Sequence, residues 1–192
     1  MDNKFEKITI EYVRNLNKFT DNFLCDLKDN IYNIKFREFG VRDLDTGYIL
    51  FEVTEEENIE NNGEIEEEIC DISRCMKYHL GPEFLDLRNI GTSLTFSVGD
   101  KPVKNLVMIE RHYFKNKLVK SFEFKFDFCI PNTVNNWETI YNIPEIDEET
   151  KQDMIESVWE TKSDSFYFVE NKLTMHHKAE YNYSQLDNII DY

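Results

Sequence analysis

Positively charged residues are scarce in this chain of 192 residues. Lysine and arginine together number 22 against 38 acidic residues, so the net charge is −16 and the pI is about 4.6. A protein that binds nucleic acid needs a basic surface, and so does one that docks on an anionic membrane. The composition therefore argues against both of these partners.

Cysteine is also rare, and long apolar runs are absent. The four cysteines form no CxxC pair and no Cys/His metal spacing, so we predict neither a metal nor a cofactor and expect reduced thiols. No stretch has the length of a signal peptide or a membrane span, so we expect a cytosolic protein without stable membrane insertion. Position 2 is Asp2, so the glycine needed for N-myristoylation of this chain itself is missing.

The common catalytic signatures are missing as well. The sequence has no GxSxG elbow, no HExxH helix and no phosphate-binding glycine loop. Two weaker options remain, an acid–base pair of Glu110 with His112 and a thiol nucleophile at Cys129 served by a histidine. We predict a protein that is not an enzyme and keep an acyl hydrolase as the alternative from a different class.

Aromatic residues are abundant, with 15 phenylalanines and 10 tyrosines. Aromatic side chains favour strands and bury large areas. Such residues build either a solid core or the wall of an apolar cavity. Composition alone favours the solid core, because cavities in proteins are few and local.

The hydrophobic pattern predicts one all-β domain, a β-sandwich with a peripheral N-terminal helix. Spacing of three to four after Thr9 predicts a helix that reaches Leu24, and a second helix follows Asp147. Between and after them, alternating segments separated by turns predict strands. The predicted strand segments are 34–36, 48–53, 76–80, 94–98, 106–114, 118–130, 166–169 and 173–183. We divide the chain into an N-terminal helical segment, 1–28, and a sandwich domain, 29–192.

An acidic segment interrupts the strands. Residues 55–68 hold eight carboxylates and no basic residue. Self-repulsion predicts a mobile, solvated loop over residues 54–72. A contact with a basic partner or a metal site is the less favoured interpretation, because no EF-hand pattern is present.

Two predicted strands place polar residues among apolar ones. In 106–114 one face carries Glu110 and His112, although the sequence does not say which face points inward. If this face points inward, the two side chains need hydrogen-bond partners or a ligand, because unpaired buried polar groups are costly. In the last strand one face carries Leu173, Met175, His177, Ala179, Tyr181 and Tyr183. An apolar wall with sparse polar groups suits a lipid chain joined by an amide.

Several long motifs resemble the uncoordinated one-nineteen lipid-binding chaperones. This family is related to the delta subunit of rod phosphodiesterase and, more distantly, to the Rho GDP-dissociation inhibitors. The resemblance covers about residues 10–184. The motifs include the segments 29–34, 42–47, 99–103, 108–114, 120–122, 128–131, 160–161, 163–169 and 175–184.

The resemblance implies an immunoglobulin-like β-sandwich with an acyl pocket between its sheets. It implies a trafficking chaperone that binds the myristoylated N-terminus of client proteins, including G-protein α subunits and ciliary cargo, in the cytoplasm and possibly the cilium. A GTP-bound Arf-like GTPase would trigger release, and the chain would act as a monomer. The implied lipid-binding residues are Phe39, Tyr78, Phe84, Glu110, His112, Phe122, Phe124, Tyr167 and Tyr181. A prenyl-binding factor of the same fold is the nearest alternative.

Overall fold

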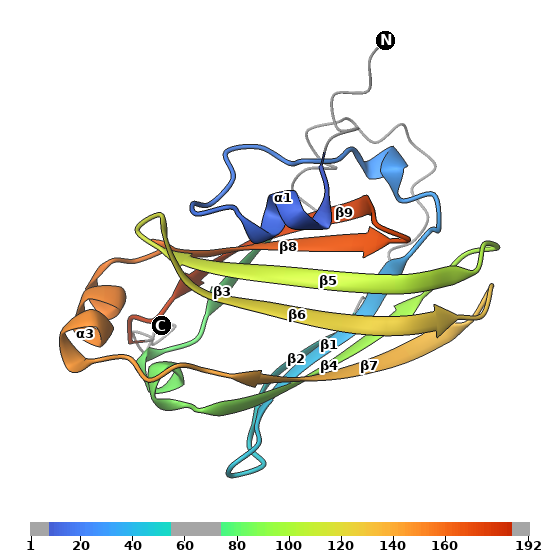
Figure 1. Cartoon of the computed structure of the whole chain (residues 1–192). Helices are drawn as coiled ribbons and strands as arrows, with labels where there is room; N and C mark the ends of the chain where they lie inside the picture. Colours follow the sequence, from blue (N-terminus) through green and yellow to red (C-terminus); the bar gives the residue numbers. More distant parts are fainter. Residues whose placement is uncertain (1–7, 55–73, 186–192) are drawn as a thin grey trace, which may run out of the picture.

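The computed structural model describes residues 8–54 and 74–185 and has two facing β-sheets (Figure 1). The four-stranded sheet has the order β2-β1-β4-β7, and the five-stranded sheet has the order β3-β9-β8-β5-β6. Every pairing is antiparallel except that of β3 with β9. The strands are β1 (Lys35–Asp43), β2 (Ile49–Thr54), β3 (Cys75–His79), β4 (Asn89–Ser97), β5 (Val103–Phe114), β6 (Lys117–Cys129), β7 (Val134–Asn142), β8 (Thr161–Val169) and β9 (Lys172–Asn182). The predicted immunoglobulin-like β-sandwich is confirmed.

Two hairpins of the five-stranded sheet use the turn residues that the sequence indicated. Lys115 and Asn116 join β5 to β6, and Glu170 and Asn171 join β8 to β9. All four have a positive φ, between 46° and 66°. Two consecutive residues with positive φ suit the right-handed twist of the flanking strands, which is why such loops connect hairpins.

The sequence pattern did not predict strand β7. Its inward residues are Trp137, Thr139 and Tyr141, while Val134 and Ile140 point outward and are more than half exposed. Apolar residues therefore lie on both faces, and a threonine takes an inward position. The period-two signal is blurred as a result.

The first helix is much shorter than predicted. The helix α1 covers Ile10–Arg14, and its predicted cap is confirmed, because Thr9 Oγ1 accepts a hydrogen bond from Tyr12 N at 3.1 Å. The extension to Leu24 is wrong. Beyond Arg14 the chain is irregular apart from the 3₁₀ turn η1 (Leu27–Asp29), and backbone groups bond the sheet instead of the helix. Tertiary contacts override a weak local preference here.

The N-terminal segment covers the outer face of the five-stranded sheet (Figure 1). Val13 of α1 is fully buried against Val107, Ile109, Phe166 and Phe168. Strands β5 and β8 are therefore buried on both faces. This explains why the sequence of residues 106–114 does not indicate a solvent-exposed face.

A buried group of charges fastens this segment to the sheet. Asp164 accepts hydrogen bonds from Thr20 N, Thr20 Oγ1, Lys178 Nζ and His176 Nε2, each at 2.9 Å. Leu24 N donates to His176 Nδ1 at 3.0 Å, so the proton of the neutral ring lies on Nε2. Burial raises the pKa of Asp164, but His176 and Lys178 outweigh it and hold the pKa below its usual value. The carboxylate is thus ionised and fully bonded.

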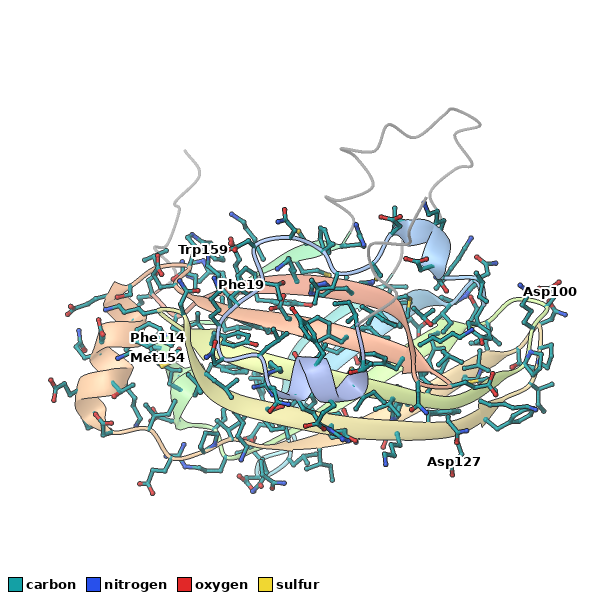
Figure 2. All side chains as sticks on the ribbon, turned by 45° about the horizontal axis from the view of Figure 1, so that its top comes forward. Phe19, Asp100, Phe114, Asp127, Met154 and Trp159 are labelled. Carbon is teal, nitrogen blue, oxygen red and sulfur yellow. The ribbon has the colours of Figure 1, made fainter. Side chains whose placement is uncertain are left out.

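The second helix closes one end of the sandwich. The helix α3 covers Glu148–Glu156, and its predicted cap Asp147 accepts from Thr150 N at 2.8 Å. Met154 packs with Leu85, from the 3₁₀ turn η2 (Pro82–Asp86), and with Tyr183. Figure 2 places Met154 and Phe114 at one end and Asp100 at the opposite end.

We expect Asp164→Asn to lower the free energy of unfolding by about 3 kcal/mol or more, because it leaves Lys178 buried without a counter-charge. Urea denaturation monitored by fluorescence measures this change. The matched control is Glu138→Gln, which breaks an exposed pair with Arg42 and should cost about 0.5 kcal/mol or less. Equal effects in the two variants would contradict the structural role of Asp164.

Candidate functional site

A cavity of about 560 Å³ lies between the two sheets. Its wall is mostly apolar and is built by inward side chains of both sheets, by the 3₁₀ turn η2 and by Met154 of α3. The aromatic residues therefore form more than a solid core. The part that is packed solid lies toward one end, around Phe96, Val103, Leu106 and Val169.

Eight of the nine residues implied by the family resemblance line this cavity. They are Phe39, Tyr78, Phe84, Glu110, His112, Phe122, Tyr167 and Tyr181. Phe124 does not line it. Its partly buried ring packs against the core cluster, with its centroid 4.9 Å from that of Tyr141 and 6.3 Å from that of Phe122. Lipid binding by these residues stays a prediction.

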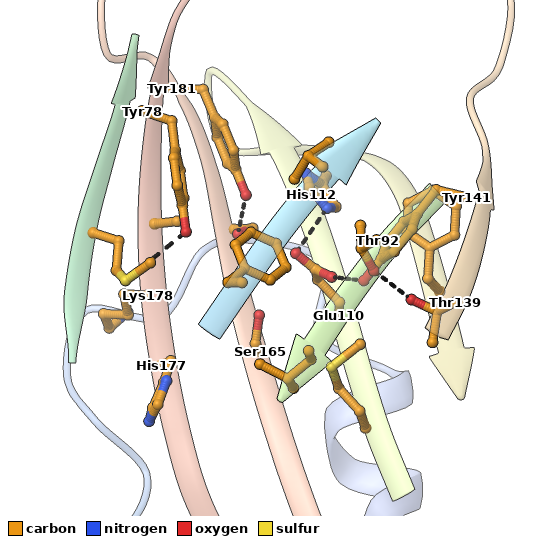
Figure 3. A pocket seen from close by; sticks show the side chains of 18 of the residues that line it. Tyr78, Thr92, Glu110, His112, Thr139, Tyr141, Ser165, His177, Lys178 and Tyr181 are labelled. Carbon is orange, nitrogen blue, oxygen red and sulfur yellow. Dashed lines mark hydrogen bonds and ion pairs between the residues drawn. The ribbon is translucent and has the colours of Figure 1, made fainter. Parts of the chain in front are cut away.

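The face of β5 that carries Glu110 and His112 is the inward one. Glu110 Oε2 accepts a hydrogen bond from the Tyr141 hydroxyl of the opposite sheet at 2.7 Å, and Oε1 lies 3.1 Å from His112 Nε2 (Figure 3). The His112 contact has the distance of an ion pair but not the alignment of a hydrogen bond. The acid–base pair considered from the sequence is thus a real contact, with Tyr141 as an unforeseen third member.

These partners set the charge of Glu110. Burial raises its pKa, but His112 and the Tyr141 hydroxyl outweigh burial and bring the pKa below its usual value. Burial and the nearby carboxylate raise the pKa of Tyr141 far above its usual range. At neutral pH the cavity therefore contains an ionised carboxylate, which can only accept hydrogen bonds, beside a tyrosine that donates one.

Other polar residues of the wall were missed by the sequence analysis. Thr92 and Thr139 of the four-stranded sheet bond each other at 2.6 Å, and Ser163 bonds the Tyr181 hydroxyl at 3.0 Å (Figure 3). Serine and threonine are also common in exposed strands. The sequence pattern therefore did not indicate that these residues face a cavity. Tyr141 was not predicted because it lies in β7, and that strand was not predicted.

The predicted face of β9 needs one correction. Met175, His177, Ala179, Tyr181 and Tyr183 line the cavity as predicted. Leu173 does not, and packs instead on the outer face beside Phe168. The register shifts between Tyr167 and Phe168, so that Thr174 is an extra residue in β9. A β-bulge of this kind reverses the side on which the preceding residues point.

Cys129 is poorly placed for catalysis. It is fully buried in the packed core and does not line the cavity. Burial raises its pKa to about 11, so the reactive thiolate is nearly absent at neutral pH. Among residues 8–54 and 74–185, no three histidine, cysteine or acidic side chains gather as metal ligands would. The acidic segment 55–68 lies outside the described residues.

Among residues 8–54 and 74–185, every helix is too short or too polar to cross a lipid bilayer.

Comparison with known proteins identifies relatives over nearly the whole chain. The family model of the GMP-PDE delta subunit matches residues 28–183. The chain is 46% identical over 186 residues to "Protein unc-119 homolog B" of Homo sapiens, covering 93% of this chain and 73% of the human protein. It is 46% identical over 180 residues to "Protein unc-119" of Caenorhabditis elegans, with 92% and 80% covered. The corresponding protein of Drosophila melanogaster is 38% identical over 192 residues, with 92% and 72% covered.

The structure predicts that the free energy of unfolding falls at acid pH because of His177. Burial is the main cause that lowers the pKa of His177 to about 4, and the charge of Arg74 adds to it. The unfolded chain, where the pKa is about 6.5, binds more protons between these two pH values. The contribution of His177 to the free energy of unfolding is therefore complete above pH 6.5 and is lost as the pH falls toward 4. The loss is at most about 3 kcal/mol.

Urea denaturation at pH 7.5, 6, 5 and 4.5 measures this loss. We expect His177→Gln to flatten the pH dependence, while Met175→Leu, a neutral change two residues away, should preserve it. A wild-type slope in His177→Gln would contradict the assignment.

Proposed function

The chain belongs to the GMP-PDE delta-subunit family, and on that premise we propose that it is a lipid-binding trafficking chaperone for N-myristoylated proteins. Its cavity would take up the acyl chain and carry the client through the cytoplasm between membranes. The observation that carries the proposal is the apolar cavity between the sheets with an ionised carboxylate in its wall.

The energetics favour such a carrier. Burial of a methylene group contributes about 0.8 kcal/mol, so a myristoyl chain represents roughly 9–10 kcal/mol of transfer free energy. The same quantity holds the lipid in a bilayer. A cavity that replaces the bilayer as the surroundings of the chain can therefore extract the client with little net cost.

The wall of the cavity favours an amide-linked chain over a prenyl group. Glu110 is an ionised acceptor and can bond the N–H of an acyl amide. A prenyl thioether has no N–H to offer. We therefore propose myristoyl clients, such as the G-protein α subunits and ciliary cargo suggested by the family resemblance, ahead of prenylated ones.

Release requires a second partner, because a deeply buried chain leaves slowly. We propose a GTP-bound Arf-like GTPase, as the family resemblance suggests. It would act by binding more tightly to a conformation whose cavity holds lipid poorly, since an effector shifts an equilibrium only through differential affinity.

Fluorescence anisotropy with labelled peptides tests the proposal. We expect a myristoylated peptide to bind tightly, the same peptide with a farnesyl group to bind more weakly, and the unmodified peptide not to bind. The GTP-bound GTPase, but not its GDP form, should lower the anisotropy of the loaded complex. Preference for farnesyl would support the prenyl-binding alternative, and release of free fatty acid over time would support a hydrolase.

A variant of His112 tests the site itself. We expect His112→Ala to weaken binding of the myristoylated peptide about tenfold, because it removes the group that holds Glu110 in place. The control His79→Ala makes the same change at an exposed histidine outside the cavity and should bind normally. Unchanged affinity in a folded His112→Ala variant would remove His112 from the site.

A further inference from the structure

The cavity reaches the surface at the edge where β2 faces β3. The rings of Phe51 in β2 and Tyr78 in β3 meet across this edge, with centroids 5.4 Å apart. Two residues along each strand, Val53 and Met76 line the cavity and are 51 and 38% exposed. Leu27 of η1 also lines it and is 43% exposed. Residues of the wall that are this exposed mark an opening.

A β-bulge places an arginine at this opening. In the pairing of β1 with β4, Phe36 faces Phe96 and Glu38 faces Thr95, so Arg37 is an extra residue. Strand β2 pairs with β1 only as far as Glu38, so Arg37 lies just past the end of that pairing. A bulge redirects a side chain and is common beside functional sites. The side chain of Arg37 is exposed and lines the cavity.

The guanidinium of Arg37 has no counter-charge. Among residues 8–54 and 74–185 it makes no ion pair and no hydrogen bond, although acidic residues outnumber basic ones in the chain by 38 to 22. The nearest acidic residues of the wall are bonded elsewhere. Asp26 lies 2.9 Å from the ammonium of Lys28, and Glu38 accepts a hydrogen bond from Thr95 at 2.9 Å. Arg37 is therefore available to a ligand.

The polar part of the wall leads to the same opening. Strand pairing aligns Glu110, Ser165 and His177 across β5, β8 and β9. The ring of Phe36, the residue before Arg37, has its centroid 5.2 Å from that of His177. A polypeptide needs hydrogen-bonding groups along its path, because an unbonded buried peptide group is costly, whereas a hydrocarbon chain needs none. This route therefore suits the polypeptide of a client and not its lipid.

A second cation lines another part of the wall. Lys120 of β6 is exposed, pairs with His112 across the strands, and makes no ion pair with a described residue. Its surroundings are more apolar, since it lies beside Val119 and its ammonium is 5.9 Å from the ring centroid of Phe122. Lys120 is the competing position at which a client could leave the cavity.

We propose that Arg37 is a specificity residue that binds the client polypeptide where it leaves the cavity, and that it favours clients with an acidic side chain within the first few residues after the acylated glycine. A guanidinium suits a carboxylate because two of its N–H groups can bond the two oxygens. The proposal rests on the proposed function and adds a chemical feature of the preferred clients.

The test uses labelled peptides with the same N-myristoyl glycine and a neutral sequence after it. A single glutamate, glutamine or lysine is placed in turn at the third, fourth, fifth or sixth residue. Anisotropy measures binding to the wild type, Arg37→Gln, Arg37→Glu, Lys120→Gln and Lys35→Gln, and melting temperatures identify folded variants. Lys35 is the matched control, because it is an exposed cation of the same strand that does not line the cavity.

We expect the wild type to bind the glutamate peptide about threefold more tightly than the glutamine peptide at the best position, which is the size of effect that an exposed ion pair gives. High salt should reduce this preference by screening the charges. Arg37→Gln should abolish it, and Arg37→Glu should reverse it in favour of the lysine peptide. Lys35→Gln and Lys120→Gln should retain it.

Three results would overturn the inference. They are the absence of a glutamate preference at every position, a preference that persists in folded Arg37→Gln, and a preference that is lost only in Lys120→Gln. Failure of the wild type to bind any of the myristoylated peptides would instead refute the proposed function.

Discussion

The two sheets of this sandwich cannot be held together by one continuous core, because a cavity of about 560 Å³ lies between them. The buried apolar side chains instead form separate clusters around the cavity. One end is packed by the cluster that contains Phe96 and Val169, and the other is closed by Leu85, Met154 and Tyr183. A third cluster lies outside the sandwich, where the N-terminal segment covers β5 and β8. The cavity is therefore flanked by apolar contacts on three sides.

Strand β8 carries polar residues on both of its faces. On the outer face of β8, Asp164 is bonded by groups of Thr20, His176 and Lys178, which fasten the N-terminal segment. On the inner face, Ser165 lies next in the chain and belongs to the cavity wall. The outer carboxylate is saturated by protein groups, whereas the polar groups inside retain free bonding capacity. This difference separates a structural polar cluster from a site that can receive a ligand.

Inside the cavity, polarity is spread across the strands. Glu110, Ser165 and His177 come from three neighbouring strands, and Tyr141 reaches Glu110 from the opposite sheet. A row of this kind crosses the five-stranded sheet at one level, while most of the remaining wall is apolar. The arrangement suits a ligand with one polar junction and a long hydrocarbon chain, which is the chemistry of a lipidated N-terminus.

The sequence by itself determined the all-β class, the two hairpin turns, the caps Thr9 and Asp147 and the long family motifs. These are local features, in which turn residues, capping side chains and period-two patterns act over a few neighbouring positions. The tertiary structure decided where α1 ends, that β7 exists, that Leu173 points outward and that Phe124 packs against the core cluster without lining the cavity. It also decided the cavity and the contact of Tyr141 with Glu110. These depend on which distant strands face each other, and no local pattern carries that information.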